Sequence, residues 1–323
     1  MSVGLQRSGK EPRVLLVALQ VLAYAGQSVL ICLTKQPDGG GFAYDVSSVV
    51  CFEEGLKLAI LVLTERQAFR GCGGLRTAAV ALLLALHGNL VFLAHAYLSP
   101  PMYQLLHHAK VVVTGVLFRA ILQQQLVLIQ WIALAQLCLA LAGTSQINCS
   151  TGADRSHPDA DWLPGVTVVL LLSVCSSLAT ALLRLGAASD GWLQLYRFLA
   201  SLAAYAFLAQ RAPLEGYTHT VFTLAGFDTA LSFAGARIFS GGNAVKIGGT
   251  ALTLLCAGLA SFYCLDFTPG NGFLRAGLLS CCALCLYYGD QRTLYRPDSE
   301  LLGPLPTCHF WEKQRDQDLP KMV

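Results

Sequence analysis

Long apolar runs of about 20 residues each follow one another along most of the chain, with short polar links between them. The runs lie at 14–34, 44–64, 75–98, 100–122, 126–146, 163–185, 191–210, 219–239, 243–265 and 271–289. A helix that crosses a membrane needs about 20 predominantly apolar residues. The pattern therefore predicts ten transmembrane helices. Very short links separate the third run from the fourth and the sixth from the seventh, and merging either pair would change the count.

Composition places the chain in the same class. Of its 323 residues, 54% are hydrophobic and only 13% are charged, whereas a soluble domain carries about 25% charged residues. We therefore expect an all-α polytopic membrane protein, and the apolar composition argues against a nucleic-acid partner.

The distribution of lysine and arginine predicts the orientation, because short cytosolic loops are enriched in these residues. With a cytosolic N-terminus, fourteen of the 22 lie on the cytosolic side and three on the opposite side. Both termini are therefore expected in the cytosol. The other five fall inside or at the edge of apolar runs: Lys57, Lys110, Arg197, Lys246 and Arg275.

This topology divides the chain into a cytosolic N-terminus (1–13), a ten-helix domain (14–289) and a flexible cytosolic tail (290–323). The domain would consist of two halves, about 14–146 and 163–289, joined by a lumenal loop at 147–162. That loop contains Asn148-Cys149-Ser150, which fits the N-glycosylation pattern. The central cysteine and the nearby membrane make Asn148 a weak acceptor.

The cysteines do not predict a disulfide framework or a metal site. Nine of the twelve lie in apolar runs without paired lumenal spacing, so we interpret them as small packing residues. The closely spaced Cys281, Cys282 and Cys285 have no neighbouring histidine. We expect neither a metal nor a cofactor.

The fourth run carries polar chemistry in the stretch "MYQLLHHAKVVVTG". In a helix, Tyr103, His107, Lys110 and Thr114 follow the i, i+4, i+7, i+11 spacing and form one polar stripe. A lysine at membrane depth costs about 2.5–3.5 kcal/mol and needs an anion or a polar cavity. The alternative is that Lys110 pairs with a carboxylate such as Glu54 and only fastens helices. For His107 and His108, hydrogen-bonded packing is the favoured reading over ligand contact.

The ninth run repeats this arrangement in the second half of the chain. Asn243 and Lys246 lie one turn apart at its beginning, and Thr250 and Thr253 continue the polar side. Lys246 lies five runs after Lys110, as an inverted repeat of five helices would place it, with the substrate site where the two repeats meet.

The second run contains Glu53, Glu54 and Lys57 in "VVCFEEGLKLAI". Glu54 and Lys57 are three residues apart on one helix face, which favours an internal ion pair. We interpret this pair as structural and Glu53 as a cavity or helix-end residue.

Several of these stretches resemble one known family. The segments "CFEEGLKL", "LALHGNLVFLA", "PPMYQLLHHAKVVVTGVLFRAIL" with "IQW", and "GGNAVK" resemble the nucleotide-sugar transporters of the Golgi, subfamily A of solute carrier family 35. The resemblance runs over most of the ten runs. It is strongest at Tyr103, Gln104, Lys110, Gln130 and Trp131, and the runs "TGVLFRAIL" and "IQWIALAQLCLALAGT" are most like the UDP-sugar branch.

The resemblance implies a ten-helix drug/metabolite-transporter fold with two inverted five-helix repeats. It also implies exchange of a cytosolic nucleotide sugar, expected to be a UDP-sugar, for lumenal nucleoside monophosphate. In such transporters the residues that match Tyr103, Lys110 and Lys246 face the nucleotide, and an Asn-Asn pair in the third span contacts it. Here only Asn89 of that pair is present.

Other family motifs are missing. The Phe-Glu-Lys motif near the end of the sixth span is absent, and the asparagine expected in the seventh is replaced by Leu195 beside Gln194. These departures weaken the substrate assignment and leave a divergent or inactive member open. The expected substrate-binding set is Asn89, Tyr103, Gln104, His107, Lys110, Thr114, Gln194, Arg197, Asn243 and Lys246.

Two alternatives stay open. A transporter of another organic anion would keep the cationic cavity, and a non-transporting scaffold for glycosyltransferases would need the fold without the lysines. An intramembrane enzyme built on histidines is disfavoured, because no carboxylate lies at ligand spacing from His87, His95, His107 or His108. We expect a multi-pass Golgi membrane protein, with the ER as alternative and with homo-oligomers or glycosyltransferase complexes as possible assemblies.

Overall fold

The computed structural model describes residues 13–35, 41–64, 69, 74–121, 126–150, 162–185, 190–209, 214–239, 243–265, 267 and 269–289. Within these ranges, the side chains of 13–17, 19, 20, 22, 23, 145–150, 162, 184, 190, 231–239 and 243–251 lie outside the described part. The described chain is helical apart from its links and one isolated bridge between Lys35 and Phe42.

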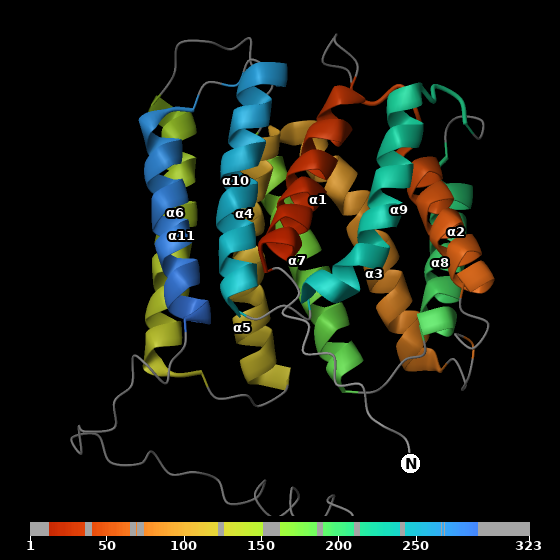
Figure 1. The fold of residues 1–323 in the computed structure, drawn as a ribbon, viewed down its shortest axis with the longest axis horizontal. Coiled ribbons are helices and arrows are strands. Elements are labelled where there is room, and N and C mark those ends of the chain that lie inside the picture. Colours follow the sequence, from red (N-terminus) through yellow and green to blue (C-terminus); the bar gives the residue numbers. More distant parts are fainter. Residues whose placement is uncertain are drawn as a thin grey trace, which may run out of the picture. The chain divides into compact units, whose positions relative to one another are not determined.

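Every predicted run falls on a helix (Figure 1). Nine runs form one helix each, and the fourth forms two. The helices are α1 (Arg13–Leu33), α2 (Val46–Thr64), α3 (Leu75–Tyr97), α4 (Pro100–His107), α5 (Ala109–Ile121), α6 (Leu128–Ser150), α7 (Trp162–Arg184), α8 (Asp190–Leu208), α9 (His219–Phe239), α10 (Asn243–Leu265) and α11 (Asn271–Tyr288).

The two shortest links are real boundaries. Leu98 and Ser99 are extended, and prolines occupy the first positions of α4, where a missing N–H costs nothing. α7 ends at Arg184 and α8 begins at Asp190. The helix of the fifth run, α6, continues to Ser150, a few residues beyond the expected end of that run at 146.

The stretches Leu75–Tyr97 and Leu163–Leu183, in α3 and α7, are long and apolar enough to cross a membrane. Shorter apolar stretches lie in α1, α6 and α10. Among the other described helices, α2 carries three buried charged residues, Glu53, Glu54 and Lys57.

The break between α4 and α5 lies at His108. Its N–H donates to the carbonyl of Leu105 (3.2 Å) and its carbonyl accepts from the N–H of Val111 (2.9 Å). Both bonds span three residues, so the helix tightens here, as it often does at a functional hinge. No proline or glycine explains the break. The segments pack on different neighbours: α4 mainly on α10 and α1, and α5 mainly on α7 and α6.

Other helices pair across large sequence separations. α3 packs against α7 and α8, α6 against α11, α1 against α10 and α9, and α2 against α8 and α9 (Figure 1). At the α3–α7 contact, a Cβ on Gly165 would come within 2.7 Å of the Leu98 side chain. This glycine therefore permits the close helix approach that is typical of membrane proteins.

Candidate functional site

Five charged residues gather where α2, α8 and α9 meet: Glu53, Glu54, Lys57, Arg197 and Asp228, called here the charge cluster. The Nζ of Lys57 lies 2.6 Å from Oδ2 of Asp228 and 3.2 Å from Oε1 of Glu54. The Nη2 of Arg197 lies 2.6 Å from the same Glu54 oxygen. Each cation of the cluster therefore has a carboxylate partner.

Amide side chains complete the hydrogen bonds of the charge cluster. The Nε2 of Gln194, on α8, donates to Oε2 of Glu54 (2.8 Å), and the Nε2 of Gln27, on α1, donates to Oδ1 of Asp228 (2.7 Å). Glu53 is buried and lies beside Asp228. The network connects α1, α2, α8 and α9, and its internal pairing is what a structural fastener requires.

Lys110, near the start of α5, is in a different situation. It is half-buried, and within the described part of the chain its Nζ has no hydrogen bond and no ion pair. The alternative that Lys110 pairs with Glu54 finds no support, because Lys57, Arg197 and Gln194 are the side chains bound to Glu54. The structure therefore presents a cation inside the bundle with no protein anion on it.

Aromatic and imidazole rings precede Lys110. The ring of Tyr103 lies 4.1 Å from that of His95 on α3 and 5.5 Å from that of His107, measured between centroids. His95 Nε2 and His107 Nδ1 are buried and have no hydrogen-bond partner among the residues that the structure describes. His87, on α3, hydrogen-bonds the carbonyl of Leu172 and lies within electrostatic reach of Lys110, Arg197 and Asp228.

Three expected substrate contacts are engaged in helix packing. The Nε2 of Gln104 donates to Ser28 Oγ (2.6 Å) and to the carbonyl of Tyr24 (2.9 Å), both on α1. The hydroxyl of Thr114 bonds Ser177 on α7 at 2.7 Å, and the Nδ2 of Asn89 donates to the carbonyl of Ala85 at 3.0 Å. In this conformation the side chains of Gln104 and Thr114 join helices, and the side chain of Asn89 bonds to the backbone of its own helix.

The remaining expected residues divide into two groups. Gln194 and Arg197 lie together, but on Glu54 in the charge cluster rather than beside Lys110. Asn243 is the first residue of α10 and Lys246 lies in its first turn. The side chains of Asn243, Lys246 and the weak glycosylation acceptor Asn148 are outside the described part.

The sequence interpretation missed Asp228 and Gln27. The signal was present, because Asp228 is a carboxylate within the apolar run at 219–239, and an ionisable residue there needs a named partner. Attention to cations alone left it out. In the residues that the structure describes, no group of three or more histidine, cysteine or acidic side chains could hold a metal ion, and Cys281, Cys282 and Cys285 are free thiols.

Comparison with known proteins gives one consistent family. Residues 44–288 match the family model described as nucleotide-sugar transporter. CMP-sialic acid transporter 1 of Arabidopsis thaliana is 24% identical over 314 residues, covering 88% of this chain and 92% of that protein. CMP-sialic acid transporter 2 of Oryza sativa subsp. japonica is 23% identical over 287 residues, covering 81% and 79%.

One solved crystal structure shares the fold, with a TM-score of 0.57 at 13% identity over 88% of this chain and 99% of that one. At this identity the likeness concerns the fold alone. The relatives are named for CMP-sialic acid, so they support the family and not the UDP-sugar branch that the sequence resemblance favoured.

Proposed function

Because the chain belongs to the nucleotide-sugar transporter family, we propose that it exchanges a cytosolic nucleotide sugar for a lumenal nucleoside monophosphate. The family and the relatives are transporters and not enzymes. The following observations support three parts of this proposal: the exchange mechanism, the substrate and the residues that bind it.

The observation that carries the proposal is the unpaired Lys110. A cation inside a membrane bundle is costly unless an anion compensates it. The cations of the charge cluster have carboxylates at 2.6 Å, whereas Lys110 has none within the described residues. The phosphates of a nucleotide sugar are the anion that this family carries, and charge-assisted hydrogen bonds to them are roughly twice as strong as neutral ones.

Two further cations belong to the proposed phosphate site. Arg197 donates from Nη2 to Glu54, but its buried Nε has no hydrogen-bond partner in the described part of the chain, so part of its donor fork is unused there. Lys246 lies in the first turn of α10, a helix that packs against α4. Tyr103 and His107 would then place their rings beside the nucleotide after a movement of α4, since Tyr103 is buried in the present conformation.

The pattern of helix pairs supports the inverted-repeat part of the proposal. If the halves correspond run by run, α1 matches α7, α3 matches α9, and the α4–α5 span matches α10. The α3–α7 pair then corresponds to α9–α1, and the α1–α10 pair corresponds to α7 with α4 and α5. All of these pairs occur. In the pairs α6–α11 and α2–α8, the two helices match each other, so each of these pairs corresponds to itself. A repeat interface running through α4, α5 and α10 is where such transporters place their substrate.

For the substrate we propose a UDP-sugar, on the sequence resemblance of the fourth and fifth runs. CMP-sialic acid is the second candidate, because the relatives are named for it. The test is uptake into proteoliposomes preloaded with UMP, CMP or GMP and offered labelled nucleotide sugars. Trans-stimulation by UMP supports the first candidate and by CMP the second. No stimulation by any monophosphate would remove nucleotide-sugar exchange altogether.

We place this activity in the Golgi membrane with both termini cytosolic, an orientation that rests on the lysine and arginine bias. Epitope tags at both ends should be accessible in cells whose plasma membrane alone is permeabilised. A tag that is reached only after the Golgi membrane is opened would contradict the orientation.

A further inference from the structure

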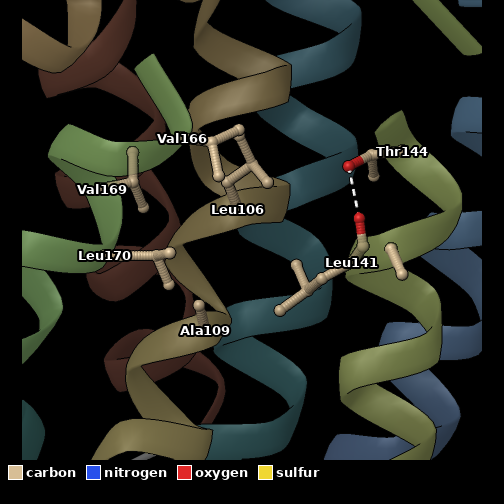
Figure 2. Close-up of a pocket in the computed structure, with 8 residues that line it drawn as sticks. Leu106, Ala109, Leu141, Thr144, Val166, Val169 and Leu170 are labelled. Carbon is tan, nitrogen blue, oxygen red and sulfur yellow. Dashed lines mark hydrogen bonds between the residues drawn. The ribbon is translucent and has the colours of Figure 1, made fainter. Parts of the chain in front are cut away.

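An apolar cavity of about 220 Å³ lies beside the break in the fourth span (Figure 2). Its walls come from Leu106 on α4, Ala109 on α5, Leu141 on α6, and Val169 and Leu170 on α7. In Figure 2 the broken span lies between α7 and α6, and the side chains of Leu106 and Leu141 point into the space that separates these helices. The cavity is thus bounded by three different spans.

The chemistry of the cavity excludes water and nucleotides as ligands. The hydroxyl in its lining, that of Thr144, donates to the carbonyl of Leu141 at 2.6 Å (Figure 2). Buried water typically needs two to four polar partners, and these walls do not offer them. A sugar nucleotide also needs polar partners and a pocket of roughly 300–1,000 Å³. The cavity therefore fits an apolar ligand of small cross-section.

The surroundings indicate which apolar occupant is available. α7 contains one of the two stretches long and apolar enough to cross a membrane, and α6 contains a shorter apolar stretch. Leu170 in the cavity wall is 44% exposed, and Leu163 on α7 and Leu139 on α6 are 61% and 72% exposed. In a membrane these exposed leucines face the acyl chains of the bilayer, which can therefore reach the cavity between α6 and α7.

We propose that one acyl chain of a bilayer phospholipid occupies this cavity. Leu106 precedes His108 and Ala109 follows it, so the chain would contact both segments of the broken span at once. Lys110 is the residue after Ala109. A bound acyl chain would therefore stabilise one relative position of α4 and α5 and with it the position of Lys110.

The test is photolabelling of the purified full chain in nanodiscs of phosphatidylcholine that carries a diazirine within one acyl chain. Peptide mapping should find label on the segments around Leu106–Ala109 and Val166–Leu170. Ala109→Leu, which fills the cavity from α5, should remove this label. Ala120→Leu is the matched control, because it makes the same change at an exposed position of the same helix and should leave the label unchanged.

The readout is lipid binding, so it is independent of which substrate is carried. Label confined to the outer faces of α6 and α7, or unchanged by Ala109→Leu, would overturn the proposal. If Ala109→Leu does not fold, the parental protein decides: label at the cavity that excess unlabelled phosphatidylcholine displaces supports the proposal, and label that it does not displace contradicts it.

Discussion

The charge cluster and the surroundings of Lys110 treat buried charge in opposite ways. Lys57 and Arg197 each lie 2.6 Å from a carboxylate oxygen, and amides from Gln27 and Gln194 complete the network. Lys110 lies in the same bundle without a protein anion in the described residues. Lys57 and Arg197 thus connect helices through their carboxylate partners, and Lys110 is available to a ligand; Arg197 would add to that ligand only the part of its donor fork that Glu54 leaves unused.

This difference has an energetic basis. Breaking a buried ion pair by removing one partner typically costs about 3–5 kcal/mol, because the other charge is left uncompensated. Removing an unpaired cation relieves a cost instead, since burial disfavours a lone charge. The two regions should therefore respond in opposite directions to the same substitution. The predictions below use that contrast.

The largest effect is expected at Lys57. Lys57→Ala removes the cation that contacts both Glu54 and Asp228, and leaves Arg197 as the cation beside Glu54. The substitution should cost about 3–5 kcal/mol of folding stability. Ligand-free melting of purified protein, or detergent-resistant yield where melting is not measurable, checks this. Asp228→Asn on the Lys57→Ala background should recover part of the loss; no recovery would show that Lys57 acts through packing alone.

Glu54 sharpens the assignment of partners. If Glu54 and Lys57 formed an isolated pair, as their spacing in the sequence suggests, Glu54→Gln with Lys57→Gln would be milder than Glu54→Gln alone. The structure reverses this expectation, because that double change strands both Arg197 and Asp228.

The rescuing partner should instead be Arg197. Glu54→Gln with Arg197→Gln retains the Lys57–Asp228 pair, and coupling between contacting residues is about 0.5–3 kcal/mol. The melting temperature should therefore be highest for Glu54→Gln with Arg197→Gln, lower for Glu54→Gln alone, and lowest for Glu54→Gln with Lys57→Gln. If Glu54→Gln with Lys57→Gln has the highest melting temperature of the three, Glu54 and Lys57 form an isolated pair after all.

Gln104 gives a smaller effect and separates packing from ligand contact. Its amide joins α4 to Tyr24 and Ser28 of α1, so Gln104→Leu should cost about 1–3 kcal/mol of stability by leaving buried partners unsatisfied. Ser28→Ala should give a related but smaller loss. A Gln104→Leu protein with parental melting that no longer shifts on adding nucleotide would make Gln104 a substrate contact.

The helices were predictable from the sequence because long apolar runs bounded by polar links leave little choice in a membrane. Even the short link at Ser99-Pro100-Pro101 was visible, since prolines begin a helix well and continue one poorly. The break at His108 was not, because no proline or glycine marks it, and the different main neighbours of α4 and α5 are visible only in the folded chain.

The site was predictable only where one helix determines it. The Tyr103–His107 contact within α4 and the Glu54–Lys57 pair within α2 follow from helical periodicity. The bond between Lys57 and Asp228 joins positions 171 residues apart, so no local pattern indicates it. Gln104 was expected at the substrate for its place in a motif, yet its amide serves the α1 contact, which only the packed structure shows.

The measurement that tests the central claim most directly is Lys110→Ala, assayed for nucleotide-sugar exchange in proteoliposomes beside its ligand-free melting temperature. Losing a cation that meets a desolvated phosphate should remove about 2–5 kcal/mol of binding. Exchange and nucleotide-induced stabilisation should therefore collapse while ligand-free melting stays at or above the parental value. Exchange at the parental rate, or a melting temperature that falls together with activity, would instead make Lys110 a structural residue and contradict the account.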